Sequence, residues 1–385
     1  MREDLQLEKL KNVCDIQPKK SEVKITTDDK TLVSFVPMKE LGINVKFFSG
    51  NVSKALEDVY KGYTYFQDGD VILAKITPCF ENGKLGIARN LSNGVGFGSS
   101  EFIPFRPKPN ILDSEYLYYF LNQDSFRNKG SSLMQGAVGH KRVQPSFYEN
   151  ELIPLPSIIE QKKIVETLEN IFTAIDQAQF NIKQTIQSTE DLFQSKLSKI
   201  FIQFDASWEE RIWDDVLEIR SGRNQKSVES DSGTYPILGS AGKVMGYAND
   251  YICEENTVII GRKGTINNPL YIKEKFWNVD TAFGLHALED LDSKFLYYFC
   301  LSYDFTERDK GSGRPSLVKK DLLTMTMPIP SLDIQKDVVI QLDNFLEAIN
   351  TLKESYKSKL SELEDLKQSI LQKAFAGELL KDSPE

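Results

Sequence analysis

The residues with the most chemical potential are basic and amide side chains on glycine-containing segments. One segment runs from Lys129 to Arg142 (KGSSLMQGAVGHKR), and another runs from Lys310 to Lys320 (KGSGRPSLVKK). A shorter basic turn is Arg262-Lys263-Gly264. Polar residues on glycine-containing turns can reach into the groove of a duplex, whereas the same residues on a sheet surface only solvate it. Any nucleic-acid binding by this chain would have to use such basic segments.

Residues that could support catalysis are few and poorly spaced. The four cysteines have no CxxC spacing, and two histidines are too few for a His-rich metal site or a plausible Ser-His-Asp set. Asn268-Pro269-Leu270-Tyr271 is similar to the Asn-Pro-Pro-Tyr motif of adenine methyltransferases, but no glycine-rich strand–loop–helix precedes it. We therefore interpret this stretch as a turn between strands, and predict that the chain itself binds no cofactor or metal.

Composition indicates a globular protein of two domains with connecting elements, since the chain has 385 residues, 40% of them hydrophobic and 27% charged. The start, MREDLQLEKLKNV, has no apolar core, and no apolar run approaches the ~20 residues that span a bilayer. We expect a cytoplasmic location without a membrane partner. The net charge of −9 argues mildly against nucleic acid, but residues 1–150 carry 20 basic and 18 acidic residues. Binding would depend on local basic clusters.

One long segment occurs twice in the chain. PLPSIIEQKKIVETLENIFTAIDQAQ starts at Pro154, and PIPSLDIQKDVVIQLDNFLEAINTLK starts at Pro328. The two align without a gap to Phe201 and Phe375, with roughly 40% of positions identical. Chance does not produce such a match, so the sequence indicates an internal duplication.

Both copies have the pattern of a long helix. Neither has an interior proline or glycine, and apolar residues recur at alternating steps of four and three, as in a coiled coil. Ser157 or Ser331 can cap the first turn, and Gly377 is placed to end the second helix. Each helix would then be ~45 residues, or ~65–70 Å, long.

The apolar stripes of the two helices match in length and spacing, so we predict that they pair. The domain between them must return the chain from the end of one helix to the start of the other, which favours an antiparallel pair. The alternative is that each helix packs on its own domain. The pattern of the first helix continues through Leu192. The expected helix-pairing residues are Ile164, Leu168, Ile171, Ile175 and Ile182 in the first helix and Val338, Leu342, Phe345, Ile349 and Tyr356 in the second.

The remaining sequence predicts two related domains rich in short strands. Gly69–Lys75 parallels Asn256–Arg262 as a buried strand that ends on a basic residue, and Ser114–Phe120 parallels Ser293–Phe299 as a short helix capped by its serine. The expected fold is α+β: two α/β domains joined by two long helices that form an antiparallel coiled coil, with an internal pseudo-two-fold repeat. The predicted parts are residues 1–153, 154–205, 206–327 and 328–385.

The doubled order of domain and helix, the repeated Pro-x-Pro-Ser…Gln-Lys helix start and the Gly-Ser-Gly-Arg-Pro-Ser loop together resemble the specificity subunits of type I restriction–modification systems. The resemblance covers essentially the whole chain. It implies two target recognition domains, each reading half of a bipartite site in double-stranded DNA, and helices that set the spacing and dock two methyltransferase subunits. It also implies that nuclease/translocase subunits join the complex, and that S-adenosylmethionine, ATP and Mg are bound on partner subunits only.

Candidate DNA contacts follow from the basic and amide residues on these turns, although a solvated surface role is an alternative for each. In the first domain they are Lys75, Asn82, Lys84, His140, Lys141 and Arg142. In the second they are Arg223, Asn224, Gln225, Lys226, Arg262, Lys263, Asn267, Asn268, Arg314, Ser316, Lys319 and Lys320. The strongest are Arg314 and the Arg262-Lys263-Gly264 turn. Gly311 and Gly313 have a rival role, in which they only supply positive φ.

Three other functions remain open at this point. A freestanding nuclease or methyltransferase lacks its expected motifs, and a methylation assay on the purified chain would test it. A coiled-coil scaffold that binds only proteins does not account for one basic glycine-rich loop in each half, and salt-sensitive DNA binding would separate the two. The specificity subunit of a type IIB-like enzyme has the same architecture.

Overall fold

A computed structural model describes residues 6–26, 28–137 and 139–379 of the chain. The chain divides into two compact units. Unit 1 comprises Met1–Phe180 with Lys359–Glu385, and unit 2 comprises Asn181–Ser358. No helix among the described residues is long and apolar enough to cross a membrane.

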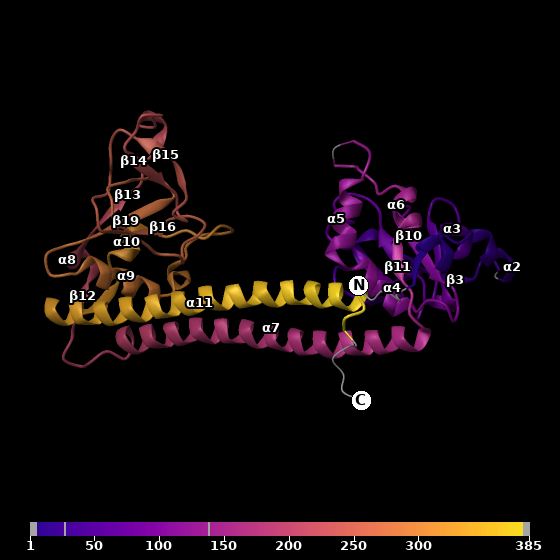
Figure 1. Ribbon diagram of the computed structural model, residues 1–385. Coiled ribbons are helices and arrows are strands. Elements are labelled where there is room, and N and C mark those ends of the chain that lie inside the picture. Colours follow the sequence, from indigo (N-terminus) through magenta and orange to yellow (C-terminus); the bar gives the residue numbers. More distant parts are fainter. Residues whose placement is uncertain (1–5, 27, 138, 380–385) are drawn as a thin grey trace. The chain divides into compact units, whose positions relative to one another are not determined.

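Unit 1 contains a five-stranded sheet of order β2-β10-β7-β8-β4, a four-stranded sheet of order β5-β3-β9-β6 and the pair β1-β11 (Figure 1). Its elements are β1 (Leu7–Lys9), α1 (Leu10–Val13), β2 (Cys14–Ile16), α2 (Val23–Thr26), β3 (Leu32–Val36), β4 (Phe47–Phe48), β5 (Val52–Ala55), α3 (Leu56–Val59), β6 (Thr64–Gln67), β7 (Val71–Ala74), β8 (Leu85–Ala88), β9 (Val95–Gly98), β10 (Phe102–Pro107), α4 (Ser114–Leu121), α5 (Asp124–Ser132), α6 (Pro145–Asn150) and β11 (Leu152–Pro154).

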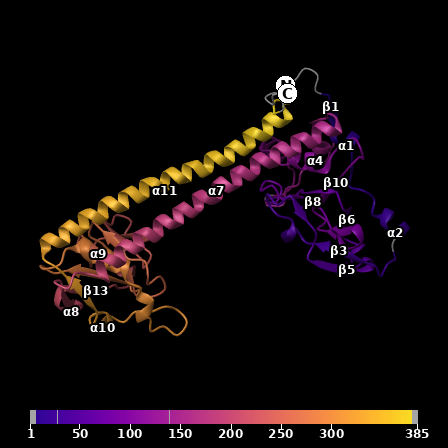
Figure 2. The ribbon, with the colours of Figure 1, turned by 90° about the horizontal axis from the view of Figure 1, so that it is seen from below.

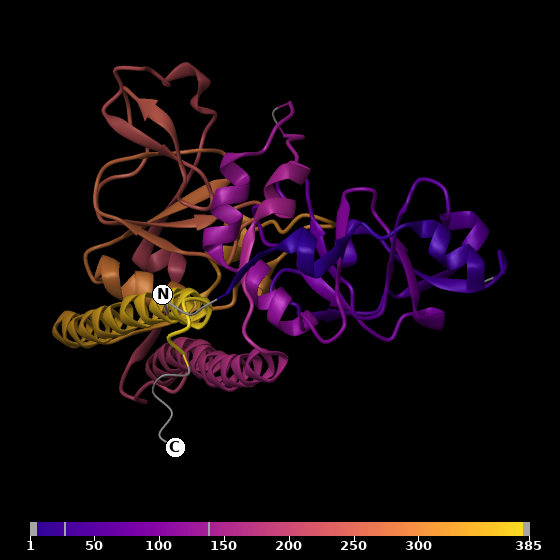
Figure 3. The same ribbon diagram turned by 45° about the vertical axis from the view of Figure 1, so that its right-hand side comes forward.

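Unit 2 contains a four-stranded sheet of order β13-β19-β16-β17, a three-stranded sheet of order β15-β14-β18 and the pair β12-β20. In Figure 3 the strands of unit 2 (rose to orange) lie on one side of the long-helix segments that belong to this unit, residues 181–201 and 332–358. Its elements are β12 (Glu209–Ile212), α8 (Trp213–Val216), β13 (Leu217–Ser221), β14 (Tyr235–Leu238), β15 (Val244–Ala248), β16 (Thr257–Gly261), β17 (Leu270–Ile272), β18 (Trp277–Asn278), β19 (Ala282–Ala287), α9 (Ser293–Ser302), α10 (Lys319–Leu322) and β20 (Thr326–Ile329).

The central strands β7 and β16 explain why both domains show unbroken apolar runs. All residues of β7 are buried; Val71 and Leu73 face the main core of unit 1, while Ile72 and Ala74 face a second core on the other side. Alternate residues of a strand point to opposite faces, so a strand covered on both faces must be apolar throughout. The order β2-β10-β7-β8 corresponds to β13-β19-β16-β17, which confirms the predicted internal repeat.

The turns before these strands and the caps of the short helices also correspond. Gly69 and Asn256, which precede β7 and β16, have φ of 88° and 58°. The predicted serine caps of α4 and α9 are wrong by one residue. The caps are Asp113 and Asp292, whose carboxylates each accept two main-chain N–H bonds from the first turn. A carboxylate also interacts favourably with the positive end of the helix dipole.

The repeated segments form the two long helices, α7 (Ile158–Phe201) and α11 (Leu332–Phe375), each of 44 residues. Ser157 caps α7 as predicted: its Oγ accepts a hydrogen bond from the Glu160 main-chain N–H at 3.3 Å, and its own N–H donates to the Glu160 carboxylate at 3.0 Å. At the end of α11, Gly377 has φ of 75° and donates its N–H to the Ala374 carbonyl, which confirms the predicted stop.

Segments of α7 and α11 lie side by side in opposite directions within each unit (Figure 2). In unit 1 Lys367 Nζ lies 2.5 Å from the Asp176 carboxylate, and in unit 2 Lys353 Nζ lies 2.6 Å from the Glu190 carboxylate. From Asp176 to Glu190 the residue number in α7 rises, while the number of the paired lysine in α11 falls from 367 to 353. The helices are therefore antiparallel, as predicted.

The helix-pairing residues pack against the other long helix and against the domain of their own unit at the same time. Leu168 and Leu342 are fully buried, and each belongs to the main core of its unit together with residues of both long helices and of the domain. The two packing arrangements that the sequence offered as alternatives are therefore combined. Leu192 is 56% exposed, whereas its neighbour Phe193 is buried and lies 6.3 Å from the Phe345 ring. The seam has shifted by one residue, as a stutter in the periodicity allows.

A buried glutamine fixes each long helix to its domain. Gln161 is fully buried; its Oε1 accepts the Asp113 main-chain N–H, and its Nε2 donates to the Ile111 and Pro156 carbonyls, all at 2.9 Å. In unit 2 Gln335 makes the same three bonds to the Asp292 N–H and to the Asp290 and Pro330 carbonyls. The repeated Gln-Lys of the sequence thus reflects one repeated junction.

We expect Gln161→Ala to lower the free energy of unfolding by about 2–4 kcal/mol, because it leaves one buried N–H and two carbonyls without their side-chain partner. Urea unfolding followed by circular dichroism measures the effect. Gln335→Ala should have a matching effect through unit 2, and Gln372→Ala, at an exposed position of α11, serves as the control. A loss below 0.5 kcal/mol for both buried glutamines would contradict the importance of the junction.

Candidate nucleic-acid interface

In unit 2 the predicted contact residues gather where β16 ends. The Arg262 N–H donates to the Thr281 carbonyl at 2.8 Å, and the Arg262 carbonyl accepts the Leu317 N–H at 2.8 Å. The glycine-rich loop before Leu317 is thereby fixed beside the Arg262 turn. The Arg262 guanidinium also lies 5.7 Å from the Phe283 ring centre, which orients it by a cation–π contact.

The loop between Asp309 and Leu317 has a defined shape. One Asp309 carboxylate oxygen accepts the Gly311 N–H at 2.7 Å and the Ser316 N–H at 2.8 Å, and these bonds lower the pKa of Asp309. Arg314 is exposed, and its guanidinium lies against Gly264, where an added Cβ would be 2.9 Å from Nη2. The loop therefore presents Arg314 next to the Arg262 turn.

The glycines of this loop do not take the rival role of supplying a positive φ. Neither Gly311 nor Gly313 falls in the left-handed region. Gly311 is instead required by close approach, because a Cβ there would lie 2.0 Å from the Arg314 carbonyl oxygen. A glycine in a tight loop can supply either a positive φ or space for a close contact, and the sequence does not distinguish these two roles.

A third basic turn adjoins the same strand end. The Arg223 N–H donates to the Asn278 carbonyl at 3.0 Å, and the preceding Gly222 N–H donates to the Ala282 carbonyl at 3.1 Å. We call Arg223, Arg262, Lys263 and Arg314 the unit 2 basic surface. Its members come from three segments that are far apart in the sequence and are joined at the start of β19.

Unit 1 repeats this arrangement with different side chains. The Lys75 N–H donates to the Glu101 carbonyl, and the Lys75 carbonyl accepts the Val143 N–H, both at 2.9 Å. These bonds match those of Arg262 to Thr281 and Leu317. α5 lies on the side of unit 1 away from α7 (Figure 1), and His140, Lys141 and Arg142 farther along the chain are exposed. Lys75, His140, Lys141 and Arg142 form the unit 1 basic surface.

The structure gives several other candidates an internal partner. Lys84 Nζ donates to the Met38 carbonyl at 2.8 Å, and Lys319 Nζ donates to the Ile219 carbonyl at 2.6 Å. The Asn267 amide bonds the Asp304 carboxylate at 3.1 Å and the Phe305 N–H at 3.0 Å. Asn224 caps a 3₁₀ turn through the Lys226 N–H, and Ser316 is half-buried. The candidates whose residues remain exposed away from the two surfaces are Asn82, Lys226, Asn268 and Lys320; Gln225 is half-buried.

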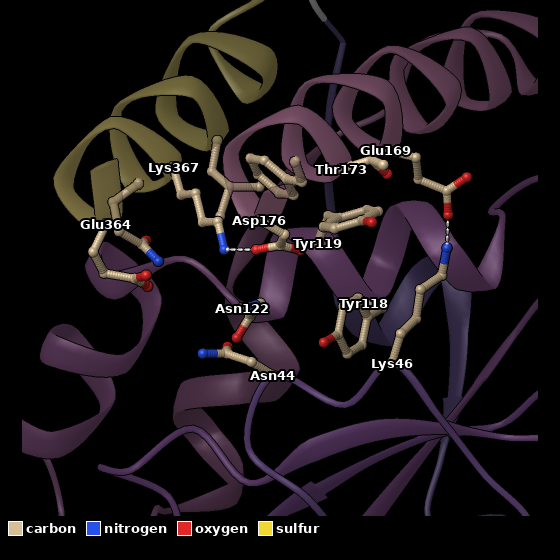
Figure 4. Close-up of a pocket in the computed structure, with 13 residues that line it drawn as sticks. Asn44, Lys46, Tyr118, Tyr119, Asn122, Glu169, Thr173, Asp176, Glu364 and Lys367 are labelled. Atoms are coloured by element: carbon tan, nitrogen blue, oxygen red, sulfur yellow. Dashed lines mark hydrogen bonds and ion pairs between the residues drawn. The ribbon is translucent and has the colours of Figure 1, made fainter. Parts of the chain in front are cut away.

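A hollow of about 350 Å³ in unit 1 is lined by residues of α4 and of both long helices (Figure 4). Lys367 pairs with Asp176 and Lys46 pairs with Glu169, while the Glu364 carboxylate lies 3.5 Å from the side-chain amide of Gln179. Burial raises the pKa of Tyr118 to about 12, so this phenol is neutral at physiological pH. Among the described residues, no group of three or more His, Cys, Asp or Glu is placed to hold a metal ion.

The two units are thus two copies of one scaffold, each with a different set of basic and polar side chains at the same strand ends. The chain belongs to the family described as the type I restriction modification DNA specificity domain, whose model matches residues 2–188 and 206–362.

Individual relatives agree with this assignment. The chain is 36% identical over 191 residues to the specificity subunit of the type I restriction enzyme EcoEI of Escherichia coli, covering 50% of this chain and 32% of the relative. It thus spans about a third of that relative's length. It is 22% identical to the EcoKI specificity subunit of Escherichia coli K12, covering 79% of this chain and 76% of the relative.

The fold is also found in a solved structure. A chain from a structural study of complex assembly and conformational transition of the type I R-M system superposes with a TM-score of 0.83 at 20% identity, and the match covers 97% of this chain and 98% of that one.

Proposed function

We propose that this chain is the DNA-recognition subunit of a type I restriction–modification complex, in which each domain reads one half of a bipartite site. The observation that carries the proposal is the pair of basic surfaces. The same main-chain bonds fix Lys75 and Arg262, yet the surrounding side chains differ. A scaffold that both units share, with different side chains at the same positions, suits two different half-sites.

The proposal includes the partners. Residues 1–153 and 206–327 act as target recognition domains, while residues 154–205 and 328–385 set the spacing and dock two methyltransferase subunits. Nuclease/translocase subunits join through that complex in the cytoplasm. The chain performs no chemistry; S-adenosylmethionine, ATP and Mg serve the partner subunits. Family membership and the two antiparallel helices support this assignment.

Methylation mapping tests the proposal directly. The chain is co-expressed with its neighbouring methyltransferase, and modified adenines are located by single-molecule sequencing. A bipartite motif with a fixed central gap, lost when this chain is omitted, is the expected result. Methylation that is absent, or unchanged without this chain, would leave only a shared fold and would favour the scaffold function.

Arg314→Ala should relax base preference in one half of the motif by roughly 5- to 150-fold at a single position, which corresponds to the ~1–3 kcal/mol of a good arginine–base contact. The same mapping experiment gives the result. Arg211→Ala is the matched control, since Arg211 lies on β12 and pairs with Asp290 at 3.0 Å. Uniformly weaker methylation at an unchanged motif would instead indicate a phosphate contact.

A further inference from the structure

We infer that Arg142 reads a guanine in the half-site of the first domain, and that Glu101 is the positioning residue that orients it. The inference rests on the proposed function and deepens it by naming a base. Glu101 precedes β10 and was not among the residues suggested by the sequence. It lies next to Lys75, His140 and Arg142, which together lower the pKa of its carboxyl, with Arg142 the main cause.

The carboxylate binds one edge of the guanidinium. Arg142 Nε donates to Glu101 Oε2 at 2.9 Å, and Nη2 donates to Oε1 at 2.7 Å. Nη1 makes only a long contact of 3.4 Å with the His140 carbonyl. An arginine has five N–H donors in a fixed plane, so one N–H on each of Nη1 and Nη2 remains available along the outer edge. These two parallel donors match the adjacent O6 and N7 acceptors of guanine in the major groove.

The main chain of Arg142 is fixed as well. Its N–H donates to the Gln135 carbonyl at 2.8 Å, and its carbonyl accepts the Gln135 N–H at 3.0 Å. Arg142 also forms a bridge with Ile76 at the end of the central strand. Gly136 allows this close pairing, because a Cβ there would lie 2.8 Å from the His140 carbonyl oxygen. With both main chain and side chain held, little conformational entropy is lost when the arginine contacts a base.

The fold does not require this ion pair. In unit 2, Thr281 stands where unit 1 has Glu101, and Ser316 stands where it has Arg142, as the matching bonds to Arg262 and Leu317 establish. Unit 2 keeps the same strand ends without the pair. The side chains of Arg142 and Glu101 are also 46% and 20% exposed, and ion pairs with such exposure add little to stability. Recognition explains the pair better than stability does.

An arginine that is held in one orientation also discriminates between guanine and adenine. Adenine presents an N6 amino donor where guanine presents the O6 acceptor. An arginine that cannot rotate away would place one of its own N–H donors against that amino donor, which is unfavourable. A lysine would keep the positive charge but would lose the paired, planar donors. The base preference should therefore depend on the guanidinium fork and on its orientation.

Motif mapping with the full-length chain and its methyltransferase tests the inference through Arg142→Lys, Arg142→Ala and Glu101→Gln. We expect the native motif to contain a guanine whose preference falls roughly 5- to 150-fold in both Arg142 variants, with the other half-site unchanged. Glu101→Gln, which keeps one acceptor oxygen, should weaken preference at that same position by a smaller factor. The altered half-site should be the one that Arg314→Ala leaves intact.

The contrary outcomes are distinct. Full guanine preference in Arg142→Lys would show that only charge matters and would overturn the inference. So would an unchanged motif in Arg142→Ala, a Glu101→Gln variant that keeps full preference, or methylation reduced equally at all positions. Failure of the proposed function would instead appear in the native chain, as the absence of any bipartite motif that depends on it.

Discussion

Seven residues inserted into both α7 and α11 should widen the unspecified gap of the methylated motif by about three base pairs. Asp176 pairs with Lys367, and Glu190 pairs with Lys353, so the same antiparallel register sets Thr185 opposite Ser358. Insertion after Thr185 and before Ser358 lengthens both helices at one level. Seven residues add ~10.5 Å of helix and preserve the coiled-coil seam. Base pairs stack at ~3.4 Å, which gives the expected change.

The matched control inserts the same seven residues into α7 alone. The seam of one helix then falls out of step with the other, so we expect lower stability and loss of methylation rather than a new gap. Half-site sequences should stay unchanged in the double insertion, because both domains are untouched. A double-insertion protein that methylates at the original gap would show that the helices do not set the spacing.

Arg106→Ala should lower the free energy of unfolding by about 3–5 kcal/mol, because it leaves a buried carboxylate without its partner. Arg106 Nε and Nη2 each lie 2.8 Å from one oxygen of Asp70, whose side chain is 1% exposed. The control, Arg211→Ala, removes an arginine from a pair in which the Asp290 side chain is 71% exposed, where about 0–1 kcal/mol is expected. Urea unfolding compares the two variants.

The loss of unfolding free energy caused by Arg106→Ala should depend on pH. Burial raises the pKa of Asp70, and Arg106 opposes that rise, so the variant raises this pKa further. A carboxyl with a raised pKa in the folded state binds more protons folded than unfolded, and the stability it contributes is lost as pH rises through that pKa. The difference in unfolding free energy between the native chain and the variant should therefore become smaller as pH falls from 7 to 5. An equal difference at both pH values would show that the charge of Asp70 is not its cause.

The long helices could be predicted from sequence because their periodicity extends over many turns and occurs twice. Single-residue details could not. Asp113 and Ser114 are both good capping residues, and only the main-chain angle decides which one precedes the first turn. The exposed Leu192 and the buried Phe193 are both apolar neighbours, and a stutter moves the seam by an amount that the pattern does not specify.

The location of the basic surfaces could also be predicted, since each follows a recognisable strand in each half. Which side chains remain available could not. Lys84 and Asn267 look like Arg262 and Asn268 in sequence, but their partners lie 46 and 37 residues away along the chain. Glu101 is acidic, whereas the sequence pattern that predicts DNA contacts consists of basic and amide residues. A comparison of the halves would not have found it, since Glu101 and Thr281 correspond only through main-chain bonds.

The division of the chain has a consequence for its synthesis on the ribosome. Unit 2 is continuous, whereas unit 1 needs residues from both ends of the described chain. Phe375 of α11 lies 4.9 Å from the Tyr116 ring and 5.4 Å from the Phe120 ring, inside the core of unit 1. The domain that emerges first therefore completes its core last, and the nascent chain carries an open apolar surface while unit 2 is translated. Chaperone binding to stalled chains that end before α11 should concentrate on α4.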